Sequence, residues 1–154
     1  MMPEVDELSG PYLSAAFLCD RVLQEGNGVL SFIRIVDRFV RPRPTEQIPP
    51  QPIQVNLAII FKGGGLPPGN YLVKIRVFKP STSSPAVEMG NDVFFDGGQD
   101  RGMNIVIPFM LLAEEDGLYW IEILFAERLF TRIPFRVILA AAQAIPVRPS
   151  PAGA

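Results

Sequence analysis

The sequence predicts an all-β protein whose strands form a two-sheet antiparallel sandwich of about eight strands. Along 117–139 the residues divide with a period of two into one apolar face and a second face that carries Glu122, Arg132 and Arg136, as in a strand that sends successive residues to opposite faces. Other segments rich in β-branched and aromatic residues recur along the chain, separated by Gly, Pro, Asn and Asp. Because 48% of the 154 residues are hydrophobic, the chain can bury one substantial core. The expected strands are 12–19, 29–40, 53–62, 70–79, 91–95, 103–112, 117–125 and 129–139.

The two halves of 117–139 are expected to pair as a hairpin. Residues opposite each other in an antiparallel pair point to the same side, so the register must match apolar with apolar side chains. A two-residue turn would set Phe125 against Arg128, whereas a three-residue connection, 126–128, avoids this mismatch. We therefore predict the three-residue connection, which also places opposite charges across from each other. The predicted pairs are Phe125 with Leu129, Ile123 with Thr131, Ile121 with Ile133, Tyr119 with Phe135 and Glu122 with Arg132.

One domain, 12–139, is expected between a flexible N-terminal arm, 1–11, and a flexible Ala/Pro-rich tail, 140–154. Helix and strand compete for the apolar segment 12–23. A glycine-containing turn signal separates it from 29–40, which favours a strand that pairs with its neighbour as a hairpin.

Proline and glycine mark the remaining connections. Segment 41–52 contains five prolines, which predicts an extended crossover between the two sheets, with a ligand for a proline-binding domain as the alternative. Pro108 interrupts 103–112, so this strand is expected at a sheet edge or next to a bulge. The glycines of 63–65 suggest a phosphate-binding loop, but no Gly-Lys-Ser/Thr sequence follows them, and an ordinary loop is favoured.

Composition and charge argue against several classes of function. The chain has 14 Lys plus Arg against 16 Asp plus Glu and no basic stripe, so nucleic acid is not an expected partner. It has no histidine, the commonest general base, and its single cysteine, Cys19, cannot form an intramolecular disulfide. No signal-peptide pattern and no apolar run of membrane-spanning length occur, so we expect a cytoplasmic protein with no membrane contact and no cofactor.

Two groups of residues suggest chemistry, and each has a simpler explanation. Cys19 beside Asp20 suggests a nucleophile, but a thiolate needs a base or positive surroundings, so a buried structural cysteine is favoured. Six loop carboxylates suggest a calcium site, although acidic residues are also common in turns. We therefore expect no enzymatic activity. The six carboxylates are Asp92, Asp96, Asp100, Glu114, Glu115 and Asp116.

Two resemblances support the sandwich. Residues 116–119, Asp-Gly-Leu-Tyr, resemble the tyrosine corner of immunoglobulin-like sandwiches, in which the tyrosine hydroxyl bonds back to nearby backbone. The alternative is that Tyr119 is simply a core aromatic residue. Segments Leu18–Val22, Leu30–Arg38 and Thr131–Val137 resemble a family of uncharacterised bacterial proteins that consist of one small β-sandwich domain. This resemblance implies the fold and supplies no catalytic residue.

The outer face of the 117–139 hairpin is the candidate functional surface. Arginine and large aromatic residues dominate interface hot spots, and a contiguous apolar patch usually has a partner. We therefore predict a non-enzymatic interaction module that binds another protein, or itself, through this face. The alternatives are that the tail or a loop covers the face, or that the loop end binds a small ligand or calcium. The candidate residues are Leu118, Trp120, Leu124, Phe130, Arg132 and Arg136.

Overall fold

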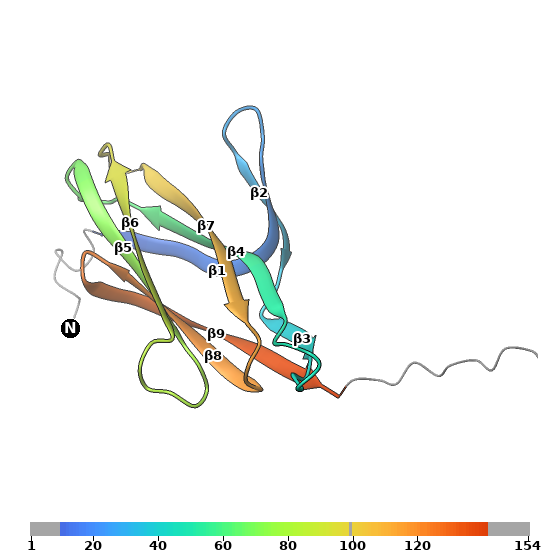
Figure 1. Cartoon of the computed structure of the whole chain (residues 1–154). Coiled ribbons are helices and arrows are strands. Elements are labelled where there is room, and N and C mark those ends of the chain that lie inside the picture. Colours follow the sequence, from blue (N-terminus) through green and yellow to red (C-terminus); the bar gives the residue numbers. More distant parts are fainter. Residues whose placement is uncertain (1–9, 99, 142–154) are drawn as a thin grey trace, which may run out of the picture.

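The computed structural model describes residues 10–98 and 100–141. In these residues nine strands form two sheets, and no segment is helical (Figure 1). The all-β, two-sheet prediction is therefore confirmed. The predicted arm and tail lie almost entirely outside the described residues. The strands are β1 (Tyr12–Gln24), β2 (Leu30–Ile35), β3 (Arg38–Pro42), β4 (Pro52–Lys62), β5 (Gly69–Phe78), β6 (Val87–Phe95), β7 (Gly102–Leu112), β8 (Gly117–Phe125) and β9 (Arg128–Ala140).

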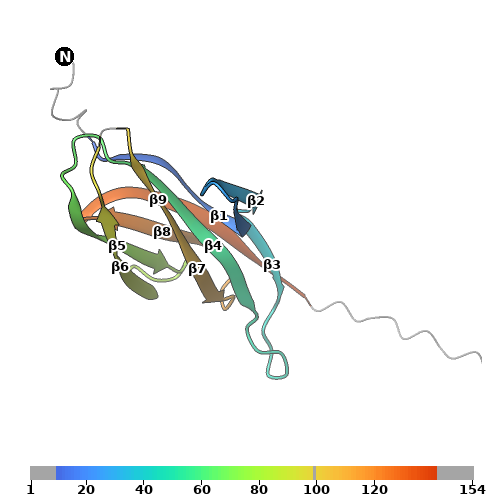
Figure 2. The ribbon, with the colours of Figure 1, turned by 90° about the horizontal axis from the view of Figure 1, so that it is seen from above.

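The two sheets lie one over the other, as the view from above shows (Figure 2). One has the strand order β2-β1-β4-β7 and the other β3-β9-β8-β5-β6. Neighbouring strands pair antiparallel except β3 and β9, which are parallel. The expected count of about eight strands is close to the nine found in the described residues, whereas the expectation that every pair is antiparallel was wrong for β3 and β9.

The additional strand arises because the second expected strand divides between the two sheets. Arg34 has a positive φ of 55°, a conformation that a regular strand does not use. The Val36 amide then donates to the Leu18 carbonyl (2.9 Å), which belongs to the four-stranded sheet. The next carbonyl, that of Asp37, accepts a bond from the Arg136 amide (2.7 Å) on β9. The chain thus crosses from one sheet to the other at this point.

The core between the sheets follows the alternation in the sequence. In β4 and β5 the alternating apolar residues from Ile53 to Phe61 and from Val73 to Val77 are buried, and Tyr71 is partly buried. The segment 12–23 is a strand, as the hairpin argument predicted. Phe135 joins the two sheets through its ring, which stacks on Tyr119 at 5.0 Å and meets Phe109 edge on at 6.0 Å. The fully buried side chains of β4 and β5 are Ile53, Leu57, Ala58, Ile59, Phe61, Val73, Ile75 and Val77.

The β8–β9 hairpin has the predicted pairs in its body and a different tip. Ile123 faces Thr131 and Glu122 faces Arg132, as expected. The predicted three-residue connection is wrong: Ala126 and Glu127 form a two-residue turn, with φ of 48° and 66°. Positive φ at both central residues is the mark of the type I′ turn that suits a twisted hairpin.

A bulge reconciles this turn with the predicted register. Phe125 pairs with Arg128 and Leu124 with Leu129, but Ile123 pairs with Thr131, so Phe130 is the extra residue on β9. The bulge turns Phe130 toward the core, where its ring lies 5.5 Å from that of Phe125.

The start of β8 contains the hydrogen bonds expected of a tyrosine corner. The Tyr119 hydroxyl donates to the Glu115 carbonyl (3.1 Å) and accepts from the Glu115 amide (3.2 Å). The residue is also fully buried, so it serves as a core aromatic at the same time. These bonds fix the turn that leads into β8.

One connection and one strand start differ from the prediction, and one strand position agrees with it. Residues 43–51 do cross between the sheets, but they are not extended, because the Thr45 hydroxyl accepts bonds from the amides of Gln47 and Ile48. Strand β6 begins at Val87 rather than at Asn91. Strand β7, which contains Pro108, lies at a sheet edge, as predicted.

Candidate functional site

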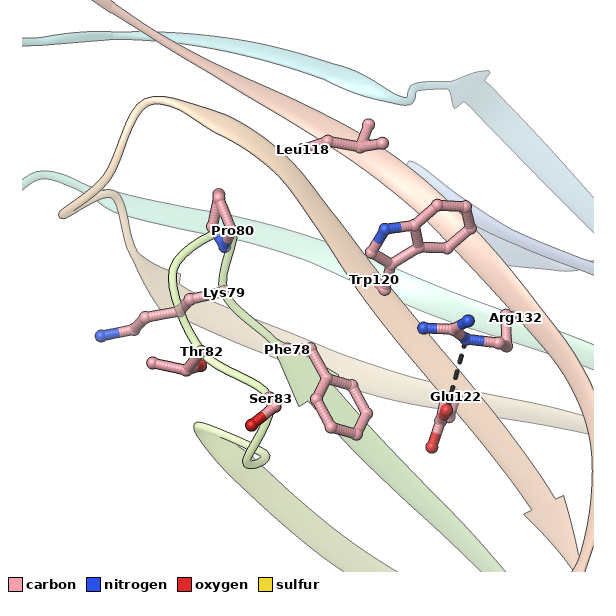
Figure 3. A pocket seen from close by; sticks show the side chains of 9 residues that line it. All are labelled: Phe78, Lys79, Pro80, Thr82, Ser83, Leu118, Trp120, Glu122 and Arg132. Atoms are coloured by element: carbon pink, nitrogen blue, oxygen red, sulfur yellow. Dashed lines mark ion pairs between the residues drawn. The ribbon is translucent and has the colours of Figure 1, made fainter.

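A hollow of about 470 Å³ lies on the outer face of the five-stranded sheet, around Trp120 (Figure 3). Its floor comes from β8 and β9, and its rim from the end of β5 and the loop that follows. Trp120 points outward because it alternates with the buried Tyr119 and Ile121. Strand pairing sets it opposite Phe78 of β5. The lining residues are Phe78, Lys79, Pro80, Thr82, Ser83, Leu118, Trp120, Glu122 and Arg132.

Arg132 contacts both Trp120 and Glu122 at the centre of this hollow. Its guanidinium carbon lies 4.9 Å from the centroid of the Trp120 ring, within the range of a cation–π contact. Its Nε lies 3.3 Å from the Glu122 carboxylate, and the two groups form an ion pair across the β8–β9 pair (Figure 3). The Glu122 side chain is only 17% exposed, whereas that of Arg132 is 49% exposed. The carboxylate therefore orients the guanidinium, which stays accessible to a partner.

The 79–86 loop forms a rim that is tied to the β7–β8 turn. Lys79 makes an ion pair with Glu114, and its side chain points away from Trp120 in Figure 3. The hydrogen bond to Glu114 raises the pKa of Lys79, although burial opposes this shift. Ser81 donates to the Glu115 carboxylate through both its hydroxyl (2.6 Å) and its amide (3.3 Å).

Gly117 lets this loop approach β8 closely. A Cβ at this position would lie 3.0 and 3.2 Å from two atoms of the Pro80 ring. The φ of Gly117 is +137°, which other residues rarely adopt. The rim therefore depends on a glycine that sits one residue before the floor of the hollow.

The structure brings together three of the six predicted site residues. Leu118, Trp120 and Arg132 line the hollow. Arg136 is exposed on the same face but lines a separate, smaller hollow near Asp37.

The other two predicted residues do not belong to an accessible outer face. Leu124 does alternate outward with Trp120, but it is only 6% exposed between Lys74 and Leu129, its partners on either side. Phe130 is turned inward by the bulge, and its ring lies 5.3 Å from that of Phe61. Leu129 takes the outer position instead and is half exposed.

The sequence argument missed the residues of the rim. Phe78 was recognisable as an outward residue of its strand, but the pairing of β5 with β8 is needed to set it opposite Trp120. Thr82 and Ser83 lie in a loop whose composition marks only a turn. The bonds from this loop to Glu114 and Glu115 join residues more than thirty positions apart.

The six carboxylates considered for calcium, of which Asp92 lies within β6, do not gather at one site. Asp96 and Asp100 follow β6, whereas Glu114 and Glu115 precede β8, and the antiparallel order puts these two loops at opposite ends of the sandwich. Several of the carboxylates are already bonded: Asp96 to Arg101, and Asp116 to the Leu139 amide at 2.8 Å. Within the described ranges no group of three or more acidic or cysteine side chains is placed to hold a metal ion.

Cys19 is fully buried, as the structural interpretation of this residue predicted. Burial raises the pKa of its thiol, and the neighbouring Asp20 carboxylate raises it further. Both effects favour the protonated, unreactive thiol.

Comparison with protein-family models found no match, and comparison with curated proteins also found none. Along the part of the chain that the structure describes, no helix has the length and apolar character needed to cross a membrane.

Proposed function

We propose that this protein is a non-enzymatic interaction module that binds another protein through the hollow around Trp120. The observation that carries the proposal is the arrangement of Trp120, Arg132 and Glu122 on a rigid sheet, beneath a loop that is tied down. Tryptophan and arginine are the residue types most enriched in binding hot spots. A site built on strands holds such groups more accurately than a site built on loops alone.

The chemistry of the lining indicates the kind of contact that the hollow would make. Phe78, Leu118 and Trp120 offer apolar surface for a hydrophobic side chain of the partner. Arg132 is half exposed although its Nε is bonded to Glu122, so it can also bond a carboxylate of the partner. The expected anchor is therefore a large apolar side chain with an acidic residue beside it.

The proposal that the protein is not an enzyme is supported by the state of its only thiol. Cys19 is fully buried and its pKa is raised, so it is a poor nucleophile. The sequence contains no histidine that could act as its base.

We further propose that the sandwich is immunoglobulin-like. The sheet orders β1-β4-β7 and β9-β8-β5-β6 correspond to strands A-B-E and G-F-C-C′ of that architecture. In this correspondence Tyr119 lies near the start of strand F, where the tyrosine corner belongs. The resemblance of Leu18–Val22, Leu30–Arg38 and Thr131–Val137 to a family of small bacterial sandwich proteins stays a proposal of the same kind.

Affinity capture with matched baits tests the proposed function. The baits are the wild-type protein, Trp120→Ala and Met110→Ala, the last removing an exposed apolar side chain from the other sheet. We expect one or more proteins to bind the wild type and Met110→Ala and to be lost from Trp120→Ala. The captured protein is then titrated against the wild type, with fluorescence of the single tryptophan as the signal. Equal capture by all three baits would show that the hollow is not the binding site.

A further inference from the structure

The β1–β2 hairpin projects beyond the body of the sandwich (Figure 1). Strand β1 pairs with β4 only as far as Cys19, which lies opposite Asn56. Beyond this point β2 is the only strand that β1 pairs with, so the projecting part is a two-stranded ribbon. A two-stranded hairpin is marginally stable in water, and a third strand would add to its stability.

Apolar side chains are unusually exposed on this ribbon. Leu23, Val29, Ile33 and Ile35 have exposed fractions between 43% and 63%. They follow one another along a single hairpin rather than being scattered over the surface. An apolar patch of this kind on a folded domain indicates a surface that another molecule covers.

Strand β2 also differs from the other strands at sheet edges. Natural sheets protect their edges with proline, charged residues or short strands. Edge strand β7 contains Pro108, β6 contains Glu88 and Asp92, and β3 contains Arg38, Arg41 and Pro42. The only charged residue of β2 is Arg34. Apart from this residue, the β2 edge has neither a charge nor a proline.

The charge of Arg34 is paired within the hairpin, and the positive φ of this residue lies next to the end of β2 rather than in its middle. Its Nε bonds the Asp20 carboxylate at 2.5 Å, on the neighbouring strand of the same hairpin. The ion pair neutralises the charge and draws the guanidinium toward β1, on the side away from the open edge.

The sequence of β2 is complementary to itself in one antiparallel register. With a two-fold axis at Ile33, this residue faces Ile33 of the partner subunit, and Ile35 faces Ser31 of the partner subunit. Arg34 then lies opposite Phe32 of the partner subunit. No like charges face each other in this register.

We propose that β2 pairs antiparallel with β2 of a second copy of the chain, joining the two four-stranded sheets into one continuous sheet. This dimer uses a surface distinct from the Trp120 hollow. It therefore leaves both hollows open, and the module binds its partner in pairs.

Sedimentation velocity over a range of concentrations tests the dimer. We expect the wild type to shift from 17.0 kDa toward twice that mass as its concentration rises. Ile33→Lys places two ammonium groups opposite each other at the two-fold axis and is expected to weaken the dimer at least about 100-fold. Met110→Lys is the matched control, because Met110 is also an exposed apolar residue of an edge strand, but of one protected by proline. Thermal melts at low concentration verify that both variants are folded.

Cysteine cross-linking tests the register. In Ile33→Cys the two new thiols face each other, with Cβ atoms about 5 Å apart, so oxidation is expected to give a covalent dimer. In Ser31→Cys the two thiols are offset by about four residues, or roughly 13 Å, and no cross-link is expected. The native Cys19 is buried and does not interfere.

Three results would overturn the proposal. One is a mass that stays at 17.0 kDa up to about 200 µM, which would leave the edge to a different protein. Another is an equal loss of association in Met110→Lys and Ile33→Lys. The third is cross-linking of Ser31→Cys as fast as that of Ile33→Cys. Trp120→Ala is expected to dimerise normally, which separates this proposal from the function assigned to the hollow.

Discussion

Trp120 and Ile121 are adjacent on β8 and point to opposite faces, so they offer a direct comparison of surface and core. Ile121 is fully buried, with Val77 and Ile133 as its partners on the neighbouring strands. Ile121→Ala removes apolar contacts and leaves a cavity between the sheets. We expect the free energy of unfolding to fall by about 2–5 kcal/mol.

Trp120→Ala removes much more surface but creates no cavity, because the side chain lines an open hollow. The loss consists of the cation–π contact with Arg132, worth about 0.5–1 kcal/mol near the surface, and of partial apolar burial. We expect a total of about 1–2 kcal/mol, clearly below the value for Ile121→Ala. The free energy of binding to the partner should show the opposite order, with Trp120→Ala losing more than Ile121→Ala. We expect Trp120→Ala to lose about 2 kcal/mol or more, which is roughly thirtyfold in affinity.

Urea denaturation followed by circular dichroism measures both stabilities, since one variant lacks the tryptophan that fluorescence would report. Affinity for the captured partner is measured on both variants under conditions where they are folded. If Trp120→Ala unfolds the protein as strongly as Ile121→Ala, then Trp120 supports the core and the argument for the hollow fails. Arg132→Gln removes the cation but keeps the tryptophan, so its stability and affinity separate the contribution of the cation from that of the ring.

Tyr119→Phe removes a hydroxyl that makes two hydrogen bonds to backbone, so the free energy of unfolding is expected to fall by about 1–3 kcal/mol in urea denaturation; an unchanged value would contradict the role of the corner. Gly63→Ala would place a methyl group 2.1 Å from the buried ring of Phe95 and is expected to cost about 1–3 kcal/mol, whereas Gly26→Ala, with open space around it, should change stability by less than about 0.5 kcal/mol. Equal melting temperatures for these two glycine variants would refute the packing argument. Burial raises the pKa of the Cys19 thiol above its ordinary value of 9.0, so the folded state loses this proton at a higher pH than the unfolded state does. The stability that results is fully present below pH 9 and is lost as the pH rises further. Cys19→Ala is therefore expected to flatten the fall in melting temperature above pH 9, and identical slopes in the two proteins would disprove this linkage.

The sequence was sufficient where alternation alone determines the outcome. On β4, β5 and β8 each strand has one strongly apolar face, and only one orientation buries it. The same constraint, with the charges of Glu122 and Arg132, determined the register in the body of the last hairpin. The outward orientation of Trp120 followed directly, because this residue lies between two residues that must point inward.

The sequence was not sufficient where one residue interrupts the alternation. Counting positions placed Phe130 outside, but a single bulge on β9 reversed it. Ala126 and Glu127 adopt positive φ without the Asn or Gly that usually marks such a turn. The rim of the hollow could not be predicted for another reason. Its position depends on which strands are neighbours, and alternation within one strand carries no information about strand neighbours.

The parallel pairing of β3 with β9 has a consequence for how the protein is made. It joins segments about 100 residues apart, so the loop closed by this pair spans most of the fold. Closing such a loop early costs entropy that few contacts offset, and we expect folding on the scale of milliseconds to seconds. During synthesis β9 leaves the ribosome after the other eight described strands, and until it arrives β3 has no described strand to pair with and Phe39 lacks the ring of Phe135. The apolar core formed by the earlier strands therefore stays partly uncovered until β9 has been made, and β9 is the strand that ends this exposure.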